Sequence, residues 1–167
     1  MHDFPHKNIW NKDIPSKVSF VLWATALGSI PTQDVLRRKG FYMVNRCHLC
    51  MRSEETGDHL FLHCKFTSLV WSYFLIGFGE NWVMPKTVVE TLRAWNVIHG
   101  NDKERFVRKV IPSALWWVIW NKRNKRAFDG RASSEEKVII ELKAMIFYWG
   151  SLTNIFQDFH FEDLVVK

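Results

Sequence analysis

Residues 47–64 read Cys47-His-Leu-Cys50-Met-Arg-Ser-Glu-Glu-Thr-Gly-Asp-His59-Leu-Phe-Leu-His63-Cys64, and they hold every cysteine of the 167-residue chain. An odd number of cysteines in so short a window is a poor disulfide framework. A Cys-x2-Cys turn followed by a histidine and a further cysteine can instead direct three sulfurs and one nitrogen at one centre. Zn²⁺ favours tetrahedral sets of this composition. The spacing therefore predicts one zinc ion held by Cys47, Cys50, His59 and Cys64.

Two other histidines compete for the fourth coordination position. His63 follows His59 by four residues, so on a regular helix both rings would share a face and could form a two-Cys, two-His site. His48 lies between the first two cysteines, where the chain must turn, and we expect it to be exposed. The remaining alternative is three thiols buried in a core without metal. If four protein ligands bind, no coordination position stays open, so we expect a structural zinc rather than a zinc hydrolase.

Most of the chain has the apolar periodicity of α-helices. Residues 15–27 show it ahead of Gly28, and residues 115–128 show it ahead of Gly130. Residues 41–57 lose the periodicity, which predicts an irregular loop or a tight hairpin around the cysteines. Helical spacing then resumes and continues without a break over residues 58–77.

The C-terminal part carries two further signals. Pro112 follows a charged segment, and because proline lacks a backbone N–H, it should start a new helix or kink an existing one. Ser133 and Glu136 have the spacing of a capping box. The apolar residues after them alternate spacings of four and three, which predicts a long amphipathic helix. Its seam consists of Val138, Leu142, Met145, Trp149, Leu152, Phe156 and Phe159.

These patterns predict one mainly α-helical domain over residues 1–167, with the zinc knuckle inserted at 44–66 and a C-terminal helical part at 102–160. Hydrophobic residues make up 47% of the chain and aromatic residues 15%, which excludes a disordered tail. The longest strictly apolar run, 114–120, is far shorter than the roughly twenty residues of a spanning helix. The N-terminal residues lack an apolar leader. We therefore expect an intracellular protein with no membrane partner.

Charge indicates a second candidate site. The formal net charge is +6, and the basic excess lies in residues 1–46 and 101–132 rather than around the cysteines. Phosphate attraction is the main source of nucleic-acid affinity, and Trp120 and Phe128 could stack on unpaired bases. The candidate nucleic-acid-binding residues are Lys122, Arg123, Lys125 and Arg126. The alternative is that this cluster, like Arg37–Lys39, only complements the dipole of a helix C-terminus.

Further motifs lie on either side of the cysteine segment. They are Ile9-Trp10, Ile14-Pro-Ser-Lys-Val-Ser-Phe20 ahead of Trp23, Thr32 through Leu36-Arg-Arg-Lys-Gly40, Asp58-His-Leu60, His63-Cys64, Trp71, and Trp116-Trp-Val-Ile-Trp120 with Arg123-Asn124 and Phe128. Taken together, the chain resembles the zinc-binding domain that follows the reverse transcriptase in plant LINE-type, non-LTR retrotransposons. Family members usually carry proline after the last motif cysteine and one residue on, where this chain has Lys65-Phe66.

The resemblance implies a carboxy-terminal CCHC zinc module of a retroelement polyprotein that assists nucleic-acid engagement during target-primed reverse transcription. Its partners would be RNA or DNA and the reverse transcriptase body, and its site of action would be the nucleus.

Catalysis has little support in the sequence. There is no Gly-rich phosphate loop, no nucleophile elbow and no Tyr-x-Asp-Asp motif of a polymerase palm. The acid pairs Glu54-Glu55 and Glu135-Glu136 fit a solvated loop and a helix start. We therefore expect no enzyme and no catalytic residues, but a non-catalytic zinc-binding module, or relic of one, that helps to engage nucleic acid. The alternative function is a zinc-stabilised protein-interaction scaffold without direct nucleic-acid contact.

Overall fold

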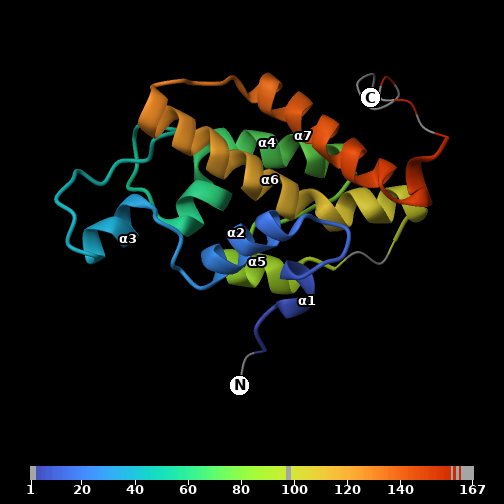
Figure 1. The fold of residues 1–167 in the computed structure, drawn as a ribbon, viewed down its shortest axis with the longest axis horizontal. Coiled ribbons are helices and arrows are strands. Elements are labelled where there is room, and N and C mark those ends of the chain that lie inside the picture. Colours follow the sequence, from blue (N-terminus) through green and yellow to red (C-terminus); the bar gives the residue numbers. More distant parts are fainter. Residues whose placement is uncertain (1–2, 97–98, 159, 161, 163–167) are drawn as a thin grey trace.

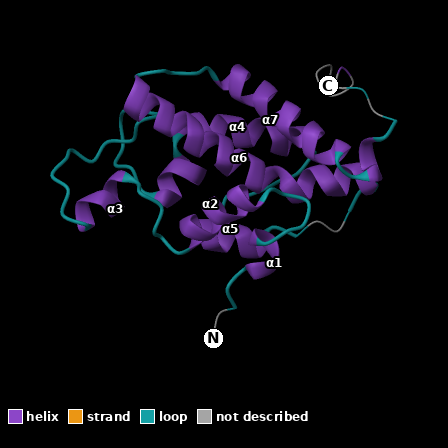
Figure 2. Ribbon diagram, viewed as in Figure 1, coloured by secondary structure: helices purple, strands orange, loops and turns teal. Residues whose placement is uncertain are grey.

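Helices dominate the computed structural model, which describes residues 3–96, 99–158, 160 and 162 (Figure 1). No strand occurs in this described part of the chain (Figure 2), so the prediction of a mainly α fold is confirmed. The elements are α1 (His6–Ile9), α2 (Ser16–Ala26), α3 (Gln33–Arg38), a π-helical turn η1 (His59–His63), α4 (Lys65–Gly77), α5 (Val88–Ala94), α6 (Asp102–Asp129), α7 (Glu135–Ser151) and a 3₁₀ turn η2 (Asn154–Phe156).

The longest helix, α6, forms the centre of the molecule. It packs against α7 on one side and α2 on the other, while α4 packs against α7 and α5 lies beside α1 and α2 (Figure 1). Seven apolar side chains in the middle of α6 have no exposed surface: Val110, Ile111, Ala114, Leu115, Trp116, Val118 and Ile119. They belong to one core cluster that extends from Ile9 to Phe156. None of the described helices is both long and apolar enough to cross a bilayer.

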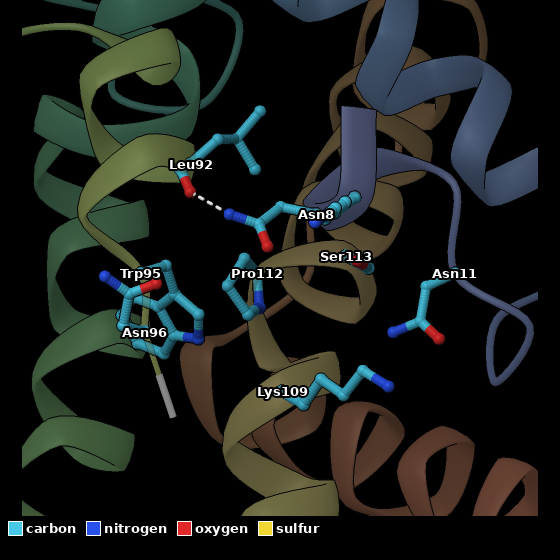
Figure 3. A pocket seen from close by; sticks show the side chains of 9 residues that line it. Asn8, Asn11, Leu92, Trp95, Asn96, Lys109, Pro112 and Ser113 are labelled. Atoms are coloured by element: carbon cyan, nitrogen blue, oxygen red, sulfur yellow. Dashed lines mark hydrogen bonds between the residues drawn. The ribbon is translucent and has the colours of Figure 1, made fainter. Parts of the chain in front are cut away.

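Helix α6 continues through Pro112, so no new helix begins there. Proline cannot donate to the carbonyl four residues earlier and pushes against it. In this fold the indole Nε1 of Trp95 donates a hydrogen bond to that carbonyl, Arg108 O, at 2.7 Å. A pocket of about 200 Å³ opens beside this point between α1, α5 and α6, and the amide of Asn8 donates to Leu92 O at its edge (Figure 3). None of the predicted zinc ligands lines it.

The C-terminal seam is shorter than the sequence indicates. The N-cap of α7 is Ser134 rather than Ser133, because the Ser134 side chain accepts from Lys137 N. The helix ends at Ser151, and Leu152 is 70% exposed, so the seam does not continue through it. The chain folds back after Ser151 and places the buried Phe156 beside Gly150, where a Cβ atom would lie 1.8 Å from the ring. Phe159 lies outside the described residues.

The cysteine segment lies at one end of the molecule with two other elements. We call this region the metal end: α3, the segment 41–64 and the last turns of α6 up to Asp129 (Figure 1). Residues 41–56 form neither helix nor strand, so the predicted irregular loop is confirmed.

Candidate metal centre

Four side chains of the metal end converge on one point. The ligand atoms of Cys47, Cys50, His59 and Cys64 all lie within 4.8 Å of one another. Cys47 Sγ is 3.9 Å from Cys64 Sγ, and Cys50 Sγ is 3.4 Å from His59 Nε2. Tetrahedral zinc with Zn–S bonds of about 2.3 Å separates two sulfurs by roughly 3.8 Å. The four residues are therefore positioned to coordinate one metal ion, and three sulfurs with one imidazole suit Zn²⁺.

A tight turn presents the first two cysteines. Met51 N donates to Cys47 O at 2.9 Å, and Cys47 N donates to Ser53 O at 2.8 Å. Met51 closes the turn in the left-handed region with φ 58°, the only described residue other than glycine with a positive φ. This conformation is unfavourable for a side chain with a Cβ atom. The turn thus carries local strain beside the metal ligands.

His59 and Cys64 reach the site because the helix between them is interrupted. The side chain of Thr56 accepts from His59 N at 3.0 Å and starts the π-helical turn. A continuous helix would separate residues five apart by about 140° around its axis. Instead Cys64 is extended, with ψ 132°, and α4 begins at Lys65. The prediction of an unbroken helix over 58–77 is therefore wrong, since the break brings both ligands to one centre. Lys65 occupies the first helical position, which also suits the proline of the family pattern.

The break frees three backbone carbonyls, and side chains of α4 satisfy them. Buried carbonyls without a partner would cost free energy. The pairs are Leu60 O with Thr67 Oγ1 (2.7 Å), Phe61 O with Trp71 Nε1 (2.9 Å) and Leu62 O with Ser68 Oγ (3.1 Å). This arrangement fixes η1 against α4 and so fixes the direction of the two ligands.

The site favours a thiolate. The Cys47 thiol donates to Cys64 Sγ, and this bond, together with bonds from His59 and from the backbone of Thr67 and Phe66 at the start of α4, lowers the pKa of Cys64 to about 4. The same hydrogen bond and burial raise the pKa of Cys47. The hydrogen bond to Cys64 also raises the pKa of His59. Zinc replaces these protons when it binds, so metal binding releases protons.

The two competing histidines lie in other environments. His63 is exposed, and its Nε2 lies 3.0 Å from Lys86 O, on the side of η1 facing the start of α5. His48 is half-buried rather than exposed as predicted, because its Nε2 lies 2.6 Å from the side-chain amide of Gln33. Burial lowers the pKa of His48, with the charge of Arg123 acting in the same direction. The structure therefore favours the Cys47, Cys50, His59, Cys64 set.

A buried ion pair joins the cysteine segment to α6, and the sequence did not predict it. Glu55 has no exposed surface, and its Oε1 accepts from Arg123 Nη2 at 2.7 Å and Nε at 3.0 Å. The same carboxylate accepts from the backbone N–H of Gln33 at 3.1 Å and of His48 at 3.1 Å. Glu55 was expected in a solvated loop, where nothing local distinguishes it from its exposed neighbour Glu54. Its burial holds α3, the first cysteine turn and α6 together.

The predicted basic cluster occupies four different environments. Arg123 is 2% exposed and bound to Glu55, so its guanidinium does not face solvent. Lys122 forms an ion pair with Glu141 of α7. Arg126 Nη1 donates to Leu49 O at 3.2 Å, in the cysteine segment. Of the four, Lys125 alone is exposed without a side-chain partner in the described structure.

The comparisons with known proteins agree with the metal site. Residues 1–71 match the family model described as zinc-binding in reverse transcriptase (zf-RVT). This segment contains all four ligands and Trp71, which holds η1, whereas α5, α6 and α7 lie beyond it. The zinc prediction and the resemblance to a reverse-transcriptase zinc-binding domain are thus confirmed for residues 1–71, which form a zinc-binding module rather than a polymerase domain. No curated protein and no solved structure matches the chain.

Proposed function

We propose that the chain is a non-catalytic zinc-binding module of a retroelement reverse transcriptase, acting in the nucleus, and that its metal end helps to engage RNA or DNA. We treat residues 1–167 as one domain in this proposal, in keeping with the core cluster that extends from Ile9 to Phe156. Zinc has a structural role here, because four protein ligands complete its coordination.

The observation that carries the proposal is a set of exposed cations at the metal end. None of them has a side-chain hydrogen bond or ion pair among the described residues, and the set comprises Arg37, Lys39, Arg46, Arg52 and Lys125. Zinc bound by three thiolates carries a formal charge of about −1, so the metal itself does not attract phosphate. These side chains supply the positive potential that a polyanion needs.

Fluorescence anisotropy of the zinc-loaded chain with RNA and DNA over a salt series tests the proposal. Binding through several phosphates gives a log–log salt slope of about −3 or steeper. Removing two contacts with Arg52→Ala and Lys125→Ala should make the slope shallower by about 2. Lys12→Ala is the matched control, because Lys12 is an exposed, unpartnered cation between α1 and α2, away from the metal end. Equal losses in both variants would contradict the proposal.

A protein-interaction scaffold is the second candidate, favoured by one face of α4. Leu69, Tyr73 and Ile76 follow helical spacing and are 49%, 38% and 77% exposed. An interface on this face would depend weakly on salt, unlike phosphate binding. Loss of a protein partner from Ile76→Asp, with nucleic-acid binding absent in the unmodified chain, would support this function instead.

A further inference from the structure

We infer that the segment 40–46 is a stacking site for the unpaired bases of single-stranded nucleic acid, with Phe41 and Tyr42 as the stacking residues. The inference rests on the proposed function and assigns it a ligand class and a position. Neither ring takes part in metal coordination, and neither belongs to the basic cluster on α6.

The backbone that carries the two rings is held at both ends. Gly40, with φ 93°, ends α3, and Phe41 N donates to Leu36 O at 3.1 Å while Gly40 N donates to Arg37 O at 3.0 Å. This is the double hydrogen bond of a Schellman motif. At the other end, the side chain of Asn45 accepts from Glu55 N at 2.8 Å, two residues before the first zinc ligand. The rings are therefore displayed from an anchored loop.

Both rings point away from the core. Tyr42 has the full exposure of an isolated side chain, at 107%, and Phe41 is 58% exposed. Phe41 occupies the Schellman position that usually packs its side chain back against the helix, yet more than half of it faces solvent. No ring contact of either residue occurs among the described residues. Two adjacent aromatic rings left in water are unusual for a packed domain and mark a contact surface.

The positive charges around the two rings favour a polyanionic ligand. Arg37 and Lys39 precede them and Arg46 follows, all exposed and without a partner in the described structure. The acidic side chain of α3, Asp34, already accepts from Arg38 at 3.2 Å and from the hydroxyl of Thr32. A single strand offers phosphates and free base faces together, so it can use both the cations and the rings. A duplex keeps its base faces stacked and can use the cations alone.

The test compares a labelled, non-self-complementary single strand of about twelve nucleotides with the same strand annealed to its complement, using anisotropy of the zinc-loaded chain. Stacking contributes about fivefold or more in affinity per base, so Phe41→Ala with Tyr42→Ala should weaken single-strand binding at least tenfold. The salt slope should stay the same, because no charge is removed. Duplex affinity should change less than twofold.

Matched variants separate stacking from other effects. Tyr42→Phe keeps a ring and should retain affinity within twofold, whereas Tyr42→Leu keeps apolar surface without a flat ring and should lose about as much as Tyr42→Ala. Val44→Ala truncates another exposed apolar side chain of the same segment, 80% exposed, and should have no effect. Zinc content and thermal unfolding should match the unmodified chain, since the rings contribute little to the core.

Four results would overturn the inference. Full single-strand affinity in the Phe41, Tyr42 double variant overturns it while leaving the proposed function intact. Equal losses for single strand and duplex exclude stacking, and retained binding by Tyr42→Leu assigns the site to general apolar contact. Absence of nucleic-acid binding in the unmodified chain, together with ring-dependent binding to vesicles of anionic lipid, overturns the proposed function as well and assigns the surface to a membrane.

Discussion

The metal end and the layer formed by α6 and α7 bury their side chains in opposite ways. The apolar side chains of α6 pack against several neighbouring elements, so the stability of this layer comes from many contacts rather than from one. In the segment 41–64, the buried groups before η1 are the zinc ligand Cys47, Leu49 and the carboxylate of Glu55, while the second ligand, Cys50, is half-buried. The comparison teaches that the helical layer distributes its stability over many apolar contacts, whereas the part of the metal end before η1 depends on a few polar and metal-directed contacts.

The largest expected effect on this contrast comes from removing the metal. Cys47→Ser or Cys64→Ser should abolish stoichiometric zinc and release the segment 41–64, because metal binding contributes about 10 kcal/mol or more in small zinc sites. Backbone amides of α6 should keep most of their protection. Zinc content together with hydrogen exchange measures both effects.

The matched control for the ligand variants is His63→Ala, which should keep full zinc content and unchanged exchange. Zinc lost from the His63 variant would overturn the ligand set. Protection lost in α6 to the same extent as in 41–64 would remove the distinction between the two regions.

The next effect concerns the link between the two regions. Glu55→Ala should lower the free energy of unfolding by about 3–5 kcal/mol, because it leaves the Arg123 guanidinium buried without its partner. Glu54→Ala, one residue away and exposed, should change it by less than about 0.5 kcal/mol. Urea unfolding of both zinc-loaded variants measures the difference. Equal effects at the two positions would show that the ion pair does not join the regions.

A smaller effect is expected inside the helical layer, at the proline of α6. Trp95→Phe should cost about 1–3 kcal/mol, because it leaves the carbonyl of Arg108 without a donor. Pro112→Ala supplies a backbone N–H at that point, so Trp95→Phe should cost less in the Pro112→Ala background. A double-mutant cycle measures this coupling. Additive costs would mean that the indole does not replace the missing donor.

The smallest effect is expected at the cysteine turn. Met51→Gly removes the Cβ atom from a left-handed position, which should raise the free energy of unfolding by up to about 1 kcal/mol after the entropy cost of glycine. Met51→Ala keeps the Cβ atom and should not stabilise the turn. Thermal unfolding of the two zinc-loaded variants checks this. Equal stability of both variants would show that the turn is not strained.

Local sequence patterns predicted those features that are set by residues close together in the chain. Spacing identified the set Cys47, Cys50, His59 and Cys64, because short-range chain closure is enough to bring such ligands together. Glycines marked the ends of α3 and α6, where a left-handed residue ends a helix. The helical class followed from apolar periodicity, which reports the buried face of each segment.

Tertiary structure decided what depends on distant partners. Arg123 appeared as a candidate for phosphate, yet its guanidinium binds Glu55, 68 residues away in the chain. The break at Cys64 is stabilised by side chains of α4 that donate to the freed carbonyls, and no local sequence pattern marks these donors. The indole of Trp95 likewise lets α6 continue through Pro112. Each outcome follows from the cost of a buried charge or carbonyl without a partner, and only the folded chain brings that partner within reach.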